Sequence, residues 1–171
     1  MTEEKKTYLQ HAFRYGTIIG FISFVYYLIG FYTELEKHTF LFDNIYFFIS
    51  IVLLITMMVK YRRMQESKVK FWRYMAIGFV ASVVISFFIS AYVFVRIMVL
   101  DPFMVYNIAS MVEQSMKAYS IDFGNEALLP VLKGTYVFAN FLVGIFNNMM
   151  YILLISLFMT MNNRIIYNKK Q

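Results

Sequence analysis

Four long apolar stretches, separated by charged segments, run through the 171-residue chain and limit its fold more than any other feature. A transmembrane α-helix needs about 20 mostly apolar residues. Lipid offers no hydrogen-bond partner to an exposed backbone, so only helices and closed barrels cross a bilayer, and the stretches lack the alternation typical of barrel strands. We therefore expect an all-α integral membrane protein, with residues 1–171 forming one domain. Its transmembrane helices should cover about residues 15–33, 42–60, 74–100 and 134–161.

The composition points to the same class. Hydrophobic residues make up 60% of the chain and charged residues 15%, against about 45–50% and about 25% in soluble domains. This balance argues against a soluble enzyme. The absence of cysteine excludes disulfides, thiolate metal ligands and cysteine nucleophiles. The first apolar stretch lacks a following Ala-x-Ala-like site, so we expect it to stay as a transmembrane helix.

Basic residues are distributed unequally along the chain. With four spans, the N-terminus, the second connection and the C-terminal tail share one side, which holds 12 of the 16 basic and 3 of the 10 acidic residues. The net charges of the two sides are then +9 and −3. Cytoplasmic segments carry the excess of Lys and Arg, so we expect both termini to be cytoplasmic. The positive net charge therefore reflects topology, and we expect no nucleic-acid partner.

The second connection, residues 60–73, concentrates basic and aromatic residues between two spans. Each Lys or Arg at the headgroup level gains about 1 kcal/mol from anionic lipid, and aromatic residues such as Trp72 are typical of the interface. We interpret the segment chiefly as an anchor that fixes topology, and a specific site for a headgroup or a protein is the alternative. The basic residues concerned are Lys60, Arg62, Arg63, Lys68, Lys70 and Arg73.

The longest connection, residues 101–133, predicts a further helix on the opposite side. Asp101 can accept hydrogen bonds from the free amides of a helix start, and Pro102 tolerates the first helical position. From Val105 onward, apolar residues recur at steps of three and four, as in an amphipathic helix. The turn residues 122–125 should end this helix. We favour a helix that covers the end of the bundle over an interfacial or partner-docking helix.

Small residues recur at intervals of four in three of the expected helices. Membrane helices associate through such residues and through side-chain hydrogen bonds. The first helix contains a G-x-x-x-G spacing, continued on the same face by Ser23, Tyr27 and Gly30. We expect these stripes to face neighbouring helices, and a dimer through the G-x-x-x-G pair remains an open alternative. The expected packing residues are Gly16, Gly20, Gly78, Ser82, Ser86 and Gly144.

Four polar residues within the apolar stretches form a candidate intramembrane site: Asn140, Asn147, Asn148 and Arg96. The Asn residues could line a solute path or hold a ligand headgroup, or they could make interhelical hydrogen bonds of about 0.6 kcal/mol each. We favour the hydrogen bonds. Arg96 follows Arg73 by 23 residues, roughly 34 Å along a helix. We therefore expect its guanidinium to snorkel to the outer interface.

Residues suited to catalysis are scarce. No Asp, Glu, His or Lys falls in the middle of a span, and ion-coupled transport usually needs such groups. His11 and His38 should lie on opposite sides of the membrane and cannot share a metal or catalytic site. Glu34 and Glu36 are expected to be solvated charges in a short outer connection. No phosphate-loop, hydrolase or zinc motif is present, so we expect no enzymatic activity, cofactor or metal.

The two expected hairpins begin alike, each with an Arg-Tyr pair followed by Ile-Gly-Phe. The matching residues are Arg14, Tyr15, Ile19, Gly20 and Phe21, and Arg73, Tyr74, Ile77, Gly78 and Phe79. With the break at Asp101-Pro102 and the uninterrupted fourth span, the chain resembles, over residues 10–165, a family of small four-helix membrane proteins of Bacteroidota. This family is known as domain of unknown function number forty-one ninety-nine. The resemblance implies a Gram-negative inner membrane and, since the family has no established activity, carries over no catalytic residue.

These features favour a non-enzymatic membrane subunit or scaffold that packs with other membrane proteins in a larger complex. The stripes of small residues and the scarcity of reactive groups are the basis of this hypothesis. The alternative is a small oligomeric transporter or channel with an Asn-lined path in the fourth span, and a lipid-modifying enzyme ranks third. The expected partners are membrane lipids and other integral membrane proteins or a second copy of the chain.

Overall fold

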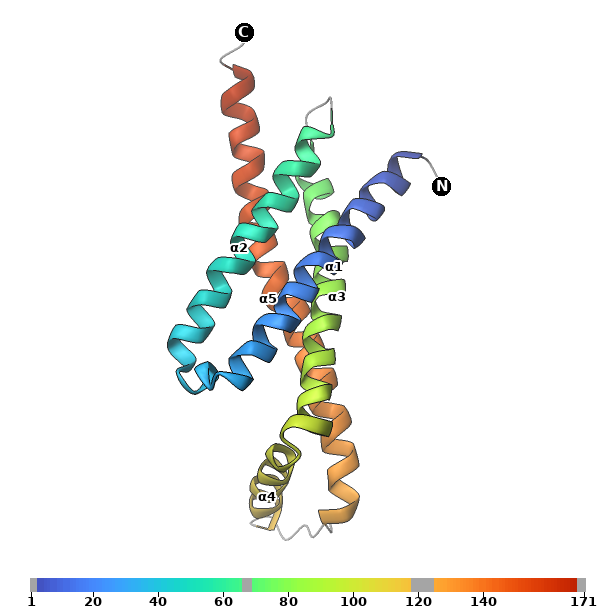
Figure 1. Ribbon diagram of the computed structural model, residues 1–171. Coiled ribbons are helices and arrows are strands. Elements are labelled where there is room, and N and C mark those ends of the chain that lie inside the picture. Colours follow the sequence, from blue (N-terminus) through green and yellow to red (C-terminus); the bar gives the residue numbers. More distant parts are fainter. Residues whose placement is uncertain (1–2, 66–68, 118–124, 169–171) are drawn as a thin grey trace.

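The computed structural model describes residues 3–65, 69–117 and 125–168, and every element within these ranges is a helix (Figure 1). Four of the helices are long and apolar enough to cross a membrane. This confirms the expected all-α membrane class. In chain order the elements are α1 (Glu3–Tyr32), the 3₁₀ turn η1 (Leu35–Lys37), α2 (Thr39–Arg63), α3 (Phe71–Val95), the π turn η2 (Arg96–Leu100), α4 (Phe103–Lys117) and α5 (Asn125–Asn168).

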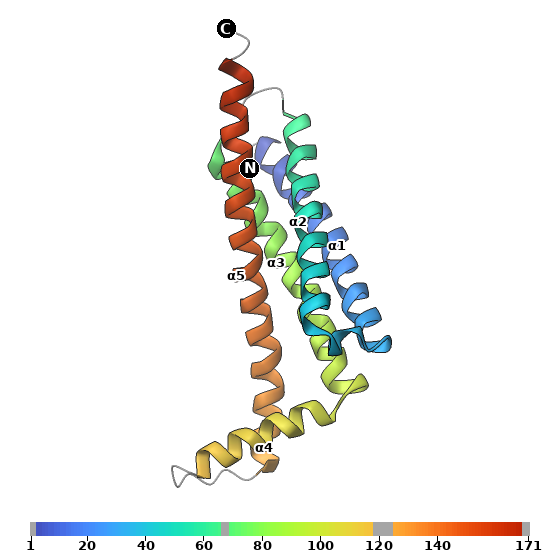
Figure 2. The same ribbon diagram turned by 90° about the vertical axis from the view of Figure 1, so that its left-hand side faces the viewer.

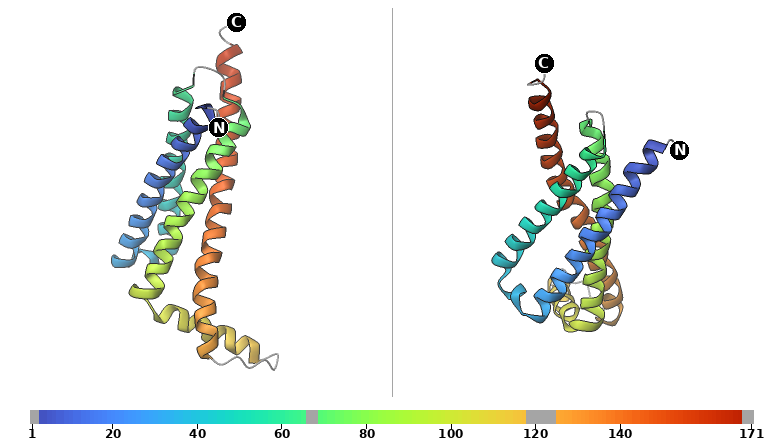
Figure 3. Two further views of the ribbon diagram at one scale, coloured as in Figure 1. Left: turned by 90° about the vertical axis from the view of Figure 1, so that its right-hand side faces the viewer. Right: turned by 45° about the horizontal axis from the view of Figure 1, so that its top comes forward.

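The helix α3 lies in the middle of the bundle. It packs along α1 on one side and along α5 on another, and these are the two most extensive contacts between helices. In contrast, α2 packs on α1 and meets α5 over only a short stretch, and in Figure 1 α2 and α5 diverge toward the lower end of α2. The bundle is therefore a row of α1, α3 and α5, with α2 laid against α1 (Figure 3).

The two ends of the bundle differ in charge. The start of α1, the end of α2, the start of α3 and the end of α5 lie together at one end (Figure 1). These described segments contain Lys5, Lys6, Arg14, Lys60, Arg62, Arg63, Lys70, Arg73 and Arg164. We call this end the basic end. The opposite, acidic end carries η1, η2 and α4, and α4 runs across it at a steep angle to α5 (Figure 2).

The fourth long helix starts earlier than the sequence indicated. We expected residues 101–133 to form a connection, but α5 already begins at Asn125 and contains Pro130. A proline inside a helix lacks the amide that would bond to the carbonyl four residues back. Pro130 is the sixth residue of α5, beyond the first four amides that have no partner within a helix, so α5 lacks one backbone hydrogen bond near its start.

The end of α3 also departs from a regular α-helix. It continues as the π turn η2, in which the Asp101 amide donates to the Arg96 carbonyl at 2.7 Å. The chain then breaks at Asp101-Pro102, because the residue before a proline disfavours helical geometry. The carboxylate Oδ1 of Asp101 accepts a hydrogen bond from the Met104 amide at 3.2 Å and so caps α4.

The helix α4 is amphipathic, as expected. Val105 and Ala109 are buried, while Asn107 and Ser110 are exposed. Val105 joins a small apolar cluster with Tyr92 from α3, and α4 as a whole contacts α5 and η2. This helix thus covers the acidic end of the bundle. Of the turn expected at residues 122–125, residues 122–124 lie outside the described part of the chain.

Candidate functional site

Small residues bring α1 close to α3. A Cβ atom added to Gly16 would lie 3.1 Å from the Ala81 Cα and from the Val84 Cβ, and one added to Gly20 would lie 2.6 Å from the Phe88 ring. Side chains of ordinary size at these two positions would therefore force the helices apart. Because α3 covers this face of α1, the G-x-x-x-G pair is occupied within the chain.

The contact between α3 and α5 is built in the same way. An added Cβ on Gly78 would overlap the side chain of Ile152, and one on Gly144 would lie 2.9 Å from the Ser86 hydroxyl. Ser82 and Ser86 are fully buried at this contact, and the Ser82 hydroxyl donates to the Gly78 carbonyl at 2.8 Å. The small-residue stripe of α3 therefore faces α5, whereas α1 packs against Ala81, Val84 and Phe88 of α3.

An ion pair at the acidic end corrects one expectation. Glu36 is not a freely solvated charge, because it pairs with Arg96. The guanidinium nitrogens Nη1 and Nη2 of Arg96 donate to the two carboxylate oxygens of Glu36, each at 2.8 Å. Both side chains are about four-fifths buried, with 23% and 22% exposed. The pair links the α1–α2 connection to the end of α3. The sequence offered one indication of this pair, because both residues were expected on the outer side of the membrane.

A small polar chamber lies beside this ion pair. It has a volume of about 390 Å³ and is lined by Tyr27, Tyr92 and Asn140 as well as by Glu36 and Arg96. The Asn140 amide donates to the carbonyl of its own helix, at Tyr136, over 2.8 Å. Lys37 and Asp43 also line the chamber, so aromatic rings lie there beside charged groups of both signs.

The three Asn residues of α5 do not share one surface. Asn140 is half-buried beside the polar chamber, Asn148 is 5% exposed, and Asn147 is exposed on the outside of the bundle. Asn147 and Asn148 are neighbours and point about 100° apart, so the burial of Asn148 leaves Asn147 on the outer surface. The sequence interpretation of one continuous Asn stripe was therefore wrong for Asn147.

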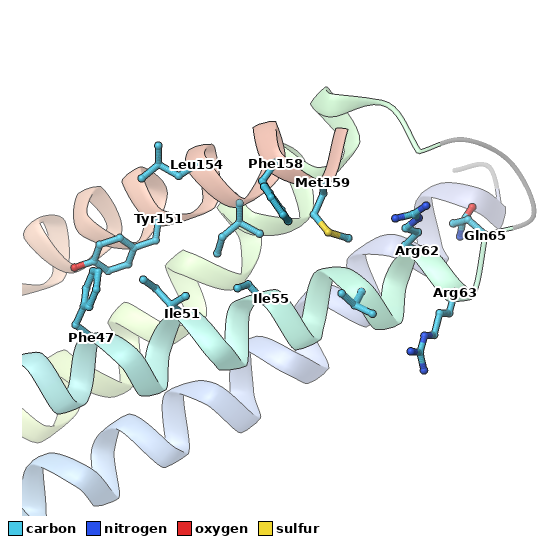
Figure 4. Close-up of a pocket in the computed structure, with 12 residues that line it drawn as sticks. Phe47, Ile51, Ile55, Arg62, Arg63, Gln65, Tyr151, Leu154, Phe158 and Met159 are labelled. Carbon is cyan, nitrogen blue, oxygen red and sulfur yellow. The ribbon is translucent and has the colours of Figure 1, made fainter. Parts of the chain in front are cut away.

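A cleft separates the basic-end halves of α2 and α5 (Figure 4). It has a volume of about 810 Å³, and we call it the basic-end cleft. Its walls are large apolar and aromatic side chains, among them Phe47, Ile51 and Ile55 on α2 and Tyr151, Ile155 and Phe158 on α5. At one end the rings of Phe47 and Tyr151 meet edge to face, with centroids 5.3 Å apart. Arg62, Arg63 and Gln65 gather at the other end (Figure 4).

The basic residues of the second connection are thus placed in different surroundings. Arg62 and Arg63 lie in the last turn of α2, at the mouth of the cleft. Lys60 points elsewhere, with its ammonium 5.4 Å from the centre of the Tyr15 ring. Lys70 is exposed just before α3, and Arg73 is half-buried within its first turn. Lys68 lies outside the described residues.

A second concave surface, the α3–α5 groove, lies in the acidic-end half. It has a volume of about 930 Å³. Ser90, Ala91 and Gly134 are small residues that line it, and a Cβ added to Gly134 would meet no atom within 4 Å. Its other lining residues include the large side chains Phe87, Phe94, Met98, Val137, Phe138 and Phe141.

His11 has a structural role that the sequence did not indicate. Its ring is buried, and its Nε2 lies 3.1 Å from the carbonyl oxygen of Met57 on α2. The bond couples α1 to α2 in the basic-end half. In the part of the chain that the structure describes, no three His, Asp or Glu side chains converge as they would around a metal ion.

No family model, curated protein or solved structure matches this chain. The resemblance to the four-helix family of Bacteroidota therefore stays a prediction from sequence motifs.

Proposed function

We propose that the chain is a non-enzymatic subunit or scaffold of a bacterial inner membrane, and that its α3–α5 groove docks a transmembrane helix of a partner protein. The basic end lies in the cytoplasm in this proposal, because positively charged segments stay on that side. The observation that carries the proposal is the groove itself, in which small residues lie among large aromatic side chains.

The chemistry of the groove favours a helix as its occupant. Helices in lipid associate where small residues let two backbones approach and where polar side chains bond across the contact. Ala91 and the open space above Gly134 permit such an approach. The Ser90 hydroxyl is buried and makes no hydrogen bond within the described residues. Because that hydroxyl is already shielded from outside, the close backbone approach that the small residues permit is what favours a helix as the occupant.

Site-specific photo-crosslinking in intact membranes tests this proposal. A photoreactive phenylalanine analogue in place of Phe138, which lines the groove and is 61% exposed, should give one discrete protein adduct. The same analogue in place of Phe146, 68% exposed on the same helix but outside the groove, is the matched control and should give none. Adding Gly134→Phe, which fills the groove, should abolish the Phe138 adduct. Adducts of equal yield at both positions, or lipid adducts alone, would contradict the proposal.

A small oligomeric transporter is the second candidate. Asn147 is exposed on the bundle surface, so it could line a path only between two copies of the chain. Asn140, beside the polar chamber, would then belong to a different part of that path. Flux measurements in liposomes with the wild-type chain and with Asn140→Leu and Asn147→Leu decide the matter. Flux that both substitutions abolish would favour this candidate over the scaffold.

A further inference from the structure

The basic-end cleft carries an inference about a different ligand. Its walls on α2 and α5 are apolar, and several wall residues remain accessible from outside, with Ile55 39%, Leu154 61% and Phe158 69% exposed. The cleft therefore opens sideways, toward the region that lipid tails fill around a transmembrane helix. It does not open toward water along its length.

One end of the cleft is closed. The edge-to-face contact between Phe47 and Tyr151 bridges α2 and α5. From Phe47 to Arg62 the walls run 15 residues along α2, roughly 22 Å at the rise of an α-helix. This length suits an acyl chain that reaches from the headgroups to the middle of a hydrocarbon core about 30 Å thick. A transmembrane helix would need a groove that continues past the ring pair.

The other end of the cleft is basic. Arg62 is half-buried and Arg63 exposed at the mouth. Among residues 3–65, 69–117 and 125–168, no carboxylate forms an ion pair with either of these two guanidinium groups. Within that part of the chain, neither guanidinium has a counter-charge. Basic pockets between transmembrane helices on the cytoplasmic side are known to hold anionic headgroups.

We propose that the basic-end cleft is a binding site for a phospholipid with an anionic headgroup. One acyl chain lies between α2 and α5 and ends at the Phe47–Tyr151 ring pair. Arg62 and Arg63 donate hydrogen bonds to the phosphate, and the planar guanidinium suits that geometry better than an ammonium does. The lipid completes the packing between α2 and α5, which meet over only a short stretch.

Native mass spectrometry of the purified full chain tests the headgroup. The protein is offered phosphatidylglycerol and phosphatidylcholine with identical acyl chains in the same detergent. The wild-type chain should retain phosphatidylglycerol preferentially. The variant Arg62→Gln/Arg63→Gln should bind it about 30-fold more weakly, as two lost headgroup contacts imply. The control Lys60→Gln/Lys70→Gln removes the same charge from the same end and should keep the preference.

A second pair of variants tests the position of the acyl chain. Ile55→Trp fills the cleft and should lower retention of both lipids, whereas Ile45→Trp, on the same helix but outside the cleft, should not. Circular dichroism and gel filtration establish that each variant folds; if Ile55→Trp does not fold, the arginine variants decide alone. An unchanged preference in Arg62→Gln/Arg63→Gln, or an equal loss in the lysine control, would overturn the site. A photoreactive residue in place of Ile55 provides a further check. If it crosslinks to another protein in a one-to-one ratio, the site holds a partner helix and the lipid proposal is wrong.

Discussion

The helices α2 and α3 both contain 25 residues, but their surroundings differ. Neighbouring helices approach α3 closely on two sides, and glycines such as Gly16 on α1 and Gly144 on α5 lie at these contacts. The face of α2 toward α5 instead carries large side chains such as Phe47 and Ile51, and a cleft remains there. Small residues thus lie where α1 and α5 pack closely on α3, and large residues line the cleft between α2 and α5.

The two regions are also held together by different forces. The α1–α3–α5 row depends on close van der Waals contact, which is the main source of helix association in lipid. The helix α2 also buries apolar side chains in the core, among them Leu54, Met57 and Met58. In addition it is tied near its two ends by polar contacts, the Arg96–Glu36 pair beyond its start and the His11–Met57 bond in its second half. If this comparison is correct, added bulk should damage the row most, and loss of one polar contact should loosen α2 to a smaller extent.

The largest effect should come from adding bulk within the row. Gly78→Leu places a side chain where the Ile152 side chain already lies, and we expect the free energy of unfolding to fall by about 3 kcal/mol, the upper part of the usual range for overpacking. Titration with a denaturing detergent, followed by circular dichroism, measures this change. The matched control is Gly134→Leu, because nothing lies within 4 Å of an added Cβ there. Equal losses of unfolding free energy in both variants would show that close packing within the α1–α3–α5 row is not what stabilises it.

Loss of the ion pair should have the second largest effect. Glu36→Gln leaves the four-fifths buried guanidinium of Arg96 without its counter-charge. We expect a loss of about 2 kcal/mol, less than for a fully buried pair because water still reaches both groups. Arg96→Gln should cost a similar amount, and the double variant should cost clearly less than the sum of the two. Additive losses in this double-mutant cycle would show that the two side chains do not act together.

The histidine contact should contribute less. His11→Ala removes the bond to the Met57 carbonyl, and we expect the free energy of unfolding to fall by about 1 kcal/mol, the usual net value of one hydrogen bond. The same variant should widen the distance distribution between spin labels on α2 and α5. Because the chain contains no cysteine, labels at Ile55→Cys and Leu154→Cys are unique. An unchanged distribution would mean that the contact does not position α2.

The sequence predicted the fold class, α4 and the small-residue stripes because each depends on local pattern. Length and hydropathy define a span, and spacing by four defines a face. The partner of a charged residue is different, because Arg96 and Glu36 are 60 positions apart and meet only once the helices are placed. The basic-end cleft could not be predicted either, since it depends on the angle between α2 and α5. Likewise, Asn147 and Asn148 follow Asn140 by seven and eight residues, and this spacing alone does not show which face of α5 is turned toward lipid.

The smallest effect should come from the other ion pair of the same connection. Glu34 and Lys37 lie 2.7 Å apart but are both about two-thirds exposed, and the hydrogen bond from Lys37 lowers the pKa of the Glu34 carboxyl. Because the pKa of Glu34 is lower in the folded chain than in the unfolded chain, the charged carboxylate stabilises the fold at pH values above its unfolded pKa. This stabilisation is lost as the pH falls through its folded pKa. Because solvent screens exposed pairs, the unfolding curve of Glu34→Gln should overlay that of the wild-type chain at neutral pH. A loss as large as that of Glu36→Gln would show that exposure does not separate the two pairs.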